Sequence, residues 1–282
     1  MKLAVSTALA AVMLGGCSPL DESDLNRLAL PVAGSDRSIH MWNLWLGTWI
    51  AVLVVLLVVG GMILYAPIRY RRKHADEPAP PQVRYNLPLE ALYTIAPVIV
   101  VAIFFFHTVE SQNAQLAEVE NPDHTIEVVG SKWQWTFNYI DGAPSGETVY
   151  DQGDPARLPE LWLPVNESVK FDLVSPDVIH SFWVPEFYFK MDVVPGRIPG
   201  KDGPNSFTMT PNREGTFTGR CAELCGVYHT RMLFKVKVVS PEEYRAHLAD
   251  LEEAGQVGRP QGATRTTTVA GIESDADTDS ED

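Results

Sequence analysis

The sequence predicts two N-terminal transmembrane helices in a helical hairpin, followed by an all-β sandwich outside the membrane. Two stretches, 41–68 and 91–109, contain no Lys, Arg, Asp or Glu. From about residue 120 the pattern changes to short runs rich in Val, Thr, Phe, Trp and Tyr, separated by Gly, Pro, Asn and Asp. Runs of this kind are typical of the short strands of a β-sandwich.

Each apolar stretch is long enough to cross a bilayer, which takes about 20 apolar residues. The segment WIAVLVVLLVVGGMILY (49–65) is apolar all round, whereas a soluble helix normally keeps a polar face. We therefore expect transmembrane helices at 41–68 and 89–109. The loop between them, 69–88, begins with RYRRKH and is cytoplasmic by the positive-inside rule.

The N-terminus has the layout of an export signal. MKLAVSTALAAVMLGGCS combines Lys2 with an apolar stretch and small residues. Its LGGC resembles the lipobox of bacterial lipoproteins, which predicts a signal peptide at 1–16, a lipidated Cys17 and an exported segment at 17–40. An ordinary signal peptide or an uncleaved anchor is the alternative. Export followed by two crossings puts the C-terminal domain outside the plasma membrane.

The acidity of the chain lies in the extracytoplasmic part. Residues 110–282 hold 14 Lys and Arg but 29 Asp and Glu, and such a surface repels nucleic acid and attracts basic proteins. We assign 110–250 to the sandwich, with a surface excursion at 141–160 and a short helix at 241–255. Residues 251–282 are assigned to an acidic disordered tail. No glycine-rich phosphate loop or GxSxG motif occurs, which argues against nucleotide chemistry and serine hydrolysis.

Soft and imidazole donors crowd one loop of the predicted sandwich. The segment CAELCGVYHTRM contains Cys221, Cys225, His229 and Met232, and His180 begins a separate strand-like run. Thiolates and thioethers favour copper, imidazole also suits it, and a compact Cys/His/Met set is typical of electron-transfer copper sites. One thiolate is enough for one copper ion, so two thiolates could bridge two.

A disulfide or a zinc site would also explain the paired cysteines. A Cys221–Cys225 disulfide suits an extracytoplasmic chain, but it leaves the neighbouring His229 and Met232 without a reason. Zinc could bind the two cysteines with His229 and His180, yet zinc does not recruit a thioether. Copper accounts for the complete set of donors.

The order of these donors, behind two membrane helices, resembles subunit II of the haem-copper cytochrome c oxidases over residues 42–251. The resemblance implies a cupredoxin-like sandwich that holds a dinuclear copper centre, CuA. It also implies the ligands: Cys221 and Cys225 as bridges, His180 and His229 on one copper each, Met232 as a weak ligand of one copper, and the backbone carbonyl of Glu223 on the other.

The same resemblance implies that the chain receives electrons from cytochrome c, stores them on CuA and passes them to haem in subunit I. There oxygen is reduced to water and protons are pumped; subunit III is a further partner. Trp133 in KWQWTF matches the exposed aromatic residue through which electrons arrive, and Trp135 would lie near it. Aromatic residues that alternate along a strand are otherwise packing residues.

Four acidic residues take roles by the same resemblance. The Glu223 side chain points to a magnesium ion shared with subunit I, and Glu90 matches the acid at the cytoplasmic mouth of the K proton pathway. A carboxylate in the first turn of a helix is also favoured by the helix dipole alone. Asp177 and Asp192 are candidates for docking a basic cytochrome c, although acids on an acidic face are commonly only solvated.

Three other functions share features with this sequence, and the sequence departs from the family in several places. The main rival is a membrane-anchored protein that binds or delivers copper; a quinol oxidase subunit II would lack the cysteines and histidines that are present here. Nitrous oxide reductase carries a similar loop behind a long catalytic domain. The excursion, lipobox and acidic tail depart from a minimal subunit II and suit a bacterial form whose cytochrome c is held at the membrane in a supercomplex.

Overall fold

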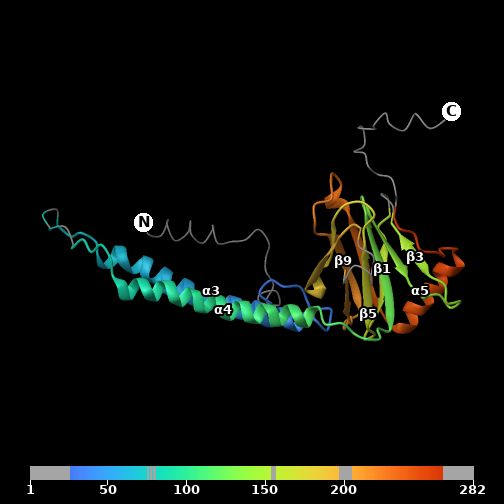
Figure 1. Ribbon diagram of the computed structural model, residues 1–282, viewed down its shortest axis with the longest axis horizontal. Coiled ribbons are helices and arrows are strands. Elements are labelled where there is room, and N and C mark those ends of the chain that lie inside the picture. Colours follow the sequence, from blue (N-terminus) through green and yellow to red (C-terminus); the bar gives the residue numbers. More distant parts are fainter. Residues whose placement is uncertain are drawn as a thin grey trace, which may run out of the picture. The chain divides into compact units, whose positions relative to one another are not determined.

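The computed structural model describes residues 26–74, 76, 78, 81–153, 157–196 and 205–262 (Figure 1). The predicted signal peptide, the lipidation site at Cys17 and the acidic residues beyond 262 lie outside these ranges. Residues 1–32 and 33–282 are two compact units, and the fold below is that of the second.

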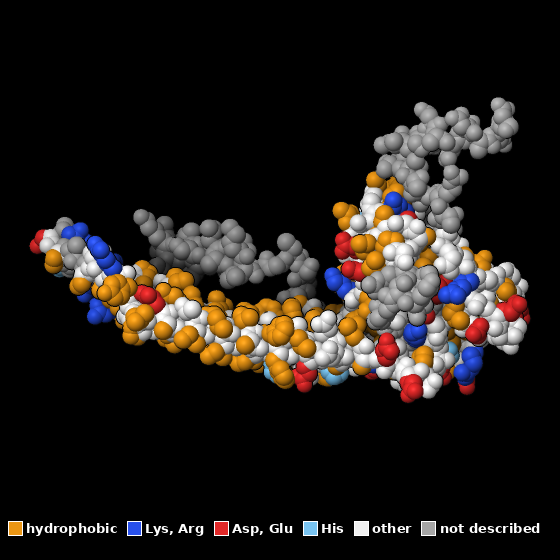
Figure 2. Space-filling model, in the orientation of Figure 1, with side chains coloured by type: hydrophobic (Ala, Val, Ile, Leu, Met, Phe, Trp, Pro, Cys, Tyr) orange, Lys and Arg blue, Asp and Glu red, His pale blue; other side chains and the backbone are white. Residues whose placement is uncertain are grey.

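Two long apolar helices open this unit. Helix α3 spans Ser38–Arg69 and helix α4 spans Leu87–Gln115, and both are long and apolar enough to cross a membrane. Figure 2 shows hydrophobic side chains along both helices and basic side chains at the turn that joins them. Both helices extend beyond the predicted apolar stretches, because helical hydrogen bonding continues through the polar residues that flank each stretch.

The two helices are tied together at the ends away from this turn. The Arg37 guanidinium donates to the backbone oxygens of Ala114, at 2.5 Å, and Ala117, at 3.0 Å. The Gln115 side chain donates in return to the Arg37 oxygen, at 3.1 Å. A helix leaves its last carbonyls without partners inside the helix, and a cation there also interacts favourably with the helix dipole. Arg37 therefore completes the C-terminus of α4.

The described part of the C-terminal domain forms ten strands in two five-stranded sheets. One sheet has the order β3-β2-β1-β5-β8 and the other β4-β10-β9-β6-β7; only the pairs β1–β5 and β4–β10 are parallel. The strands are β1 (His124–Ser131), β2 (Gln134–Tyr139), β3 (Val149–Gln152), β4 (Glu160–Pro164), β5 (Val169–Val174), β6 (His180–Val184), β7 (Phe189–Val193), β8 (Ser206–Met209), β9 (Gly215–Cys221) and β10 (Leu233–Val239).

The predicted all-β sandwich is confirmed, and two strands were missed. Eight of the ten strands fall on the apolar runs read from the sequence. Strand β3 lies inside the excursion at 141–160, where turn-forming residues surround it, and β7 follows β6 after the short 3₁₀ turn Pro185–Phe187. Both are edge strands, and an edge strand is set by its one neighbour more than by its own composition.

Aromatic rings fill the space between the sheets. The rings of Phe182 and Phe234 stack with centroids 5.1 Å apart, and the Trp135 ring meets Phe234 edge-on at 5.4 Å. Gly219 on β9 makes this packing possible, because a Cβ there would lie 2.0 Å from the Phe234 ring. Each fully buried large apolar side chain contributes about 1.5–3 kcal/mol, so this cluster is a principal source of stability.

A short helix closes the domain. Helix α5 spans Pro241–Glu253, close to the predicted 241–255, and begins with a capping box between Ser240 and Glu243. Its inward face buries Tyr244, Leu248 and Leu251. Residues 251–262, assigned from the sequence to the acidic tail, instead belong to this helix and to a segment packed on the sandwich. The assignment from sequence failed because their partners are distant in the chain.

Candidate metal centre

The candidate metal ligands come from the β9–β10 hairpin and from the start of β6. Strand β9 ends at Cys221, and the loop returns through the 3₁₀ turn His229–Arg231 to β10. The Cys221 amide donates to the Met232 oxygen at 3.0 Å, which closes the loop at its base. Phe182 of β6 pairs with Cys221, and this pairing brings His180 alongside the loop.

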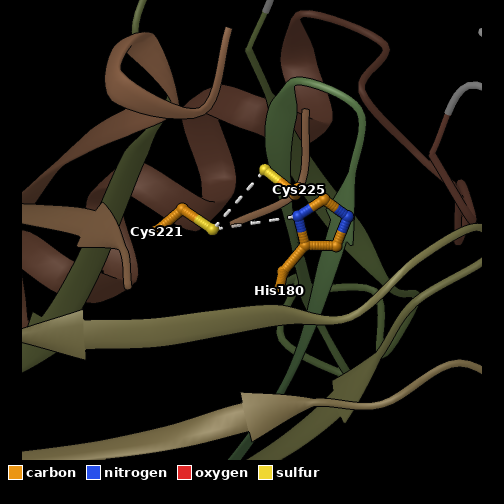
Figure 3. A group of neighbouring side chains, drawn as sticks. All are labelled: His180, Cys221 and Cys225. Carbon is orange, nitrogen blue, oxygen red and sulfur yellow. Dashed lines mark hydrogen bonds between the residues drawn. The ribbon is translucent and has the colours of Figure 1, made fainter. Parts of the chain in front are cut away.

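Five donor side chains lie close together, four from this loop and His180 from β6. Figure 3 shows three of them. The Sγ atoms of Cys221 and Cys225 are 3.8 Å apart, and Cys221 Sγ is 3.9 Å from His180 Nδ1. Cys225 Sγ is also 3.6 Å from His229 Nδ1 and 3.8 Å from Met232 Sδ. The backbone oxygen of Glu223 lies 3.2 Å from Cys221 Sγ.

These distances fit a metal centre and do not fit a disulfide. Both cysteines are free, and their 3.8 Å separation is far longer than the S–S bond of about 2.05 Å. Two metal–sulfur bonds of about 2.3 Å can span it. The two thiols are 6% and 4% exposed, and His180 and Met232 are 0% and 1% exposed. His229 is half-buried. Soft sulfur donors combined with imidazoles suit copper.

The two thiols are electrostatically linked. The hydrogen bond from Cys225 lowers the pKa of the Cys221 thiol, and the same contact raises the pKa of the Cys225 thiol. A second thiolate would face the negative charge of the first, so the pair releases one proton readily and the other with difficulty. A cation bound between the sulfurs would favour both thiolates.

Asp177 holds His180 in place. Its Oδ1 is 2.8 Å from His180 Nε2, which leaves Nδ1 facing the sulfurs, and its Oδ2 accepts from the Lys132 amide at 2.7 Å. Burial acts to raise the pKa of Asp177, but the hydrogen bonds from His180 and from the Lys132 and Val178 amides lower it to about 2. A carboxylate behind a histidine ligand fixes the ring orientation. The Asp177 side chain is only 22% exposed, and its predicted docking role stays a prediction.

Trp133 reaches the site from the partly exposed β1–β2 turn. Its Nε1 donates to the Cys225 oxygen at 3.2 Å, and its ring meets Tyr228 edge-on at 5.0 Å. Gly226 lets the indole lie close to the loop, because a Cβ there would be 3.0 Å from the Trp133 ring. Trp135 is fully buried, and its Nε1 donates to the backbone oxygen of Met232 at 3.3 Å. Tyr228 carried no signal in the sequence beyond its place in the loop.

The remaining predicted residues lie away from the sulfurs or point outward. The Glu223 side chain is exposed, as is Asp192 on β7. Glu90 lies in the first turn of α4, where its Oε1 accepts from the Asn86 amide at 2.9 Å. His107, also on α4, is 3.3 Å from Glu110 through Nδ1 and Oε2. Glu90 thus hydrogen-bonds the N-terminus of its own helix, and its proton-pathway role stays a prediction.

Two apolar helices and a sandwich with a buried Cys/His/Met cluster at one end define a class of protein with two candidate membrane spans and a candidate metal site, whose donors are of the kind found in electron-transfer copper proteins. Comparison with known proteins narrows this class. The family model for the cytochrome c oxidase subunit II periplasmic domain matches residues 155–239.

Relatives extend the similarity to nearly the whole chain. A probable cytochrome c oxidase subunit 2 of Streptomyces avermitilis is 42% identical, over 94% of this chain and 91% of its own length. The cytochrome c oxidase subunit 2 of Mycobacterium tuberculosis is 30% identical, over 88% of this chain and 80% of its own length. The crystal structure of the subunit II periplasmic domain of Bradyrhizobium japonicum is 28% identical with a TM-score of 0.41, covering 49% of this chain and 99% of that one.

The chain belongs to the cytochrome c oxidase subunit II family. The resemblance read from the sequence is thereby confirmed, and so is the fold class of two apolar helices followed by an all-β sandwich. A membrane protein with an extracytoplasmic C-terminal domain fits both the two apolar helices and the periplasmic domain model.

Proposed function

We propose that this chain is the electron-accepting subunit of a cytochrome c oxidase. It takes single electrons from cytochrome c at a dinuclear CuA centre and passes them to haem in subunit I, where oxygen is reduced to water and protons are pumped. The observation that carries the proposal is the convergence of two free thiols, two imidazoles and a thioether in a chain of this family.

The ligand residues divide the work of holding two metal ions. The two sulfurs, 3.8 Å apart, would hold both ions, and His180 and His229, which each approach a different sulfur, would each bind one of them. The thioether of Met232 and the backbone oxygen of Glu223 would complete the donor set. Bound copper would supply a one-electron store shared by two ions through the thiolates. The surrounding strands preorganise the donors, which keeps rearrangement small.

Trp133 provides a covalent and hydrogen-bonded route from the surface to the centre. Its indole is partly exposed, and its Nε1 contacts the backbone oxygen of the ligand Cys225. An electron that reaches this ring is one hydrogen bond from a ligand residue. The Tyr228 ring holds the indole at its edge, so the two rings form one aromatic surface beside the loop. Asp192 is retained as an acidic residue for docking a basic cytochrome c.

The remaining assignments concern partners and neighbours. The exposed Glu223 carboxylate is available for a magnesium ion shared with subunit I, and Glu90 for the mouth of a proton pathway. Subunits I and III are the partners of the membrane hairpin. Cys17 is the lipid anchor, after removal of the signal peptide at 1–16. A copper-delivery role is less favoured, because the sulfurs are at most 6% exposed and a delivery site has to exchange its metal.

The proposal is tested by stopped-flow reduction of the purified oxidase with reduced cytochrome c. The copper centre should be reduced before the haem, and Trp133→Phe should slow that first step while the copper spectrum is preserved. Trp162→Phe is the matched control, since Trp162 stacks on His247 at 4.1 Å and has no contact with the ligand loop among its described interactions. Haem reduction before copper would contradict the function, and an unchanged rate in Trp133→Phe would contradict only the route.

A further inference from the structure

Residues 33–38, which lead into the first turn of α3, pack against the sandwich, and we call them the junction segment. Ser35 forms an antiparallel bridge with Pro211. Next to this bridge, the Asp36 amide donates to the Thr210 oxygen at 3.0 Å, and the Asp36 carboxylate accepts from the Thr210 amide at 2.9 Å. The junction segment thus pairs like a short strand with the part of the chain that leads into β9.

The same segment holds the 3₁₀ turn that follows β6. The Ser35 and Ser38 hydroxyls donate to the backbone oxygen of Phe187, at 3.1 Å and 3.3 Å. The Gly34 amide donates to the backbone oxygen of Glu186 at 2.8 Å. Both serines are only 2% exposed. Because a buried polar group costs free energy unless it is hydrogen-bonded, these bonds specify how the turn lies on the junction segment.

Arg37 joins this packing to the second apolar helix. It belongs to the junction segment, and its guanidinium donates to the backbone oxygens of Ala114 and Ala117 at the end of α4. The Gln115 side chain, in a residue that is 8% exposed, donates in return to the Arg37 oxygen. One short segment therefore holds α3, α4 and the sandwich together, in addition to the covalent connection 116–123 between α4 and β1.

The two parts of the sandwich that the junction segment holds lead along strands to the ligand loop. Strand β6 begins at the proposed ligand His180, and the turn with Phe187 follows its other end. Strand β9 begins at Gly215, shortly after the paired Thr210, and ends at the proposed ligand Cys221. The two strands are antiparallel neighbours in one sheet. Because strands hold side chains more precisely than loops do, a shift at the junction segment is carried along both strands to the metal site.

We propose that the junction segment positions the copper centre for electron transfer, because it fixes the far ends of β6 and β9 to the two apolar helices. The inference rests on the proposed function, in which electrons pass from this centre to haem in subunit I. The rate of such a transfer falls steeply with the separation of the two centres, so it depends on where the whole domain lies. The positioning residues are Ser35, Asp36, Arg37 and Ser38, and none of their described interactions is with the ligand loop.

Flash reduction of the complete oxidase separates the reduction of copper by cytochrome c from the transfer of the electron to haem. A double-serine variant, Ser35→Ala with Ser38→Ala, should slow the second step by about tenfold, because a displacement of about 1 Å from the productive geometry can cost about 100-fold in rate. The rate of the first step, the copper spectrum and the reduction potential of copper should stay at their wild-type values, because every ligand is kept. A role in stability alone would lower the yield of folded oxidase and leave both rates unchanged.

A second variant, a control and a second measurement complete the test. Arg37→Met keeps an unbranched side chain but removes the bonds to α4, and should also slow the second step. Ser240→Ala is the control, since it removes the cap of α5 by the same kind of substitution and should leave both steps unchanged. Hydrogen exchange on the purified full-length chain needs no partner subunit. The Asp36 and Thr210 amides should be protected in the wild type and exchange faster in the double-serine variant.

Four outcomes would overturn the inference. The first is a second step at the wild-type rate in both the double-serine variant and Arg37→Met. The second is rapid exchange of the Asp36 and Thr210 amides in the wild-type chain, because the junction segment would then not be held. The third is an altered copper spectrum or a slower first step in the double-serine variant, which would place the effect on the ligands. The fourth is a wild-type oxidase whose haem is reduced before copper, which would overturn the proposed function and the inference with it.

Discussion

Two buried polar clusters in the same sandwich are completed in different ways. One cluster consists of Glu127, Asn138, Arg259 and Gln261; it fastens the segment after α5 to β1 and β2, and we call it the exit clamp. There the Glu127 carboxylate receives four hydrogen bonds from side chains of the chain itself, two of them from a guanidinium. In the ligand loop, the Cys221 and Cys225 thiols face each other, two imidazoles and a thioether at 3.6–3.9 Å. The sulfur and nitrogen atoms of these side chains therefore face one another with their lone pairs.

A structural cluster and a binding site can be told apart by whether the chain itself supplies the balancing charge. Glu127 is a hard, charged oxygen donor that is satisfied by a cation from residue 259. The thiols are soft donors held by backbone contacts at the base of a hairpin, and a thiolate needs a metal or another cation to balance its charge. The clamp is thus expected to affect stability, and the loop to affect copper and activity.

The largest expected effect is on the loop. Cys221→Ser should abolish the dinuclear copper signal and cytochrome c oxidation, because a serine hydroxyl is not a soft bridging ligand. Copper content per chain and the copper spectrum of the purified oxidase measure the change. Cys17→Ser is the control, since it removes the one cysteine of the sequence outside the ligand loop, at the proposed lipidation site. A dinuclear spectrum retained in Cys221→Ser would refute the bridging assignment.

A smaller loss is expected behind the ligands. Asp177→Asn keeps the shape of the side chain but removes the charge that orients His180, and should lower copper affinity by roughly 10–100-fold. Competition with a copper chelator measures it. Asp192→Asn, at an exposed position on the neighbouring strand β7, should leave the affinity unchanged. Equal effects of the two substitutions would mean that Asp177 acts only as one more acid of the surface.

A substitution in the exit clamp should change the free energy of unfolding and leave the copper site unchanged. Arg259→Ala leaves the carboxylate of Glu127 buried with fewer partners and should lower the free energy of unfolding by about 1–3 kcal/mol, with the copper spectrum unchanged. Urea unfolding of the purified chain measures this. Arg245→Ala is the control, because its contact with Glu167 is long, at 3.9 Å, and exposed. A wild-type unfolding midpoint in Arg259→Ala would show that the clamp does not hold the segment.

The clamp also predicts a pH dependence. Burial acts to raise the pKa of Glu127, but the hydrogen bond from Arg259, with those from Asn138 and Gln261, lowers it below the ordinary 4.5. A carboxylate with a lowered pKa in the folded state contributes stability above its unfolded pKa and loses it as the pH falls. The stability gap between wild type and Glu127→Gln should therefore be full near pH 7 and shrink below pH 4.5. A gap that is constant down to pH 3 would contradict this.

The smallest effect is expected from the weak ligand. Met232→Leu replaces one buried apolar side chain by another of similar volume, which usually costs less than about 1.5 kcal/mol. Copper should be retained, and only the reduction potential of the centre should change, because the thioether contact with Cys225 is lost. A redox titration measures the potential. Loss of copper in this variant would make Met232 a principal ligand.

The sequence predicted those parts of the fold that depend on local composition. The two membrane helices follow from uninterrupted apolar stretches, and most strands follow from runs of β-branched and aromatic residues. The ligand loop was visible because Cys221, Cys225, His229 and Met232 lie within twelve residues. The involvement of His180 followed from its residue type and from the family resemblance.

The rest depends on contacts between distant residues. Glu127 and Arg259 are 132 positions apart, and neither has a neighbour in sequence that reveals the pair. Asp177 was interpreted as a surface acid, because its hydrogen bond to the Lys132 amide crosses 45 positions. Strands β3 and β7 pair at sheet edges that composition does not mark. Tertiary packing decided each of these features.

The central claim is that the loop holds two copper ions that share one electron. Electron paramagnetic resonance with copper quantitation on the purified full-length chain tests it most directly. We expect two copper ions per chain and a hyperfine pattern from one unpaired electron spread equally over two copper nuclei. A single-copper pattern, or a folded chain that binds no copper, would contradict the account.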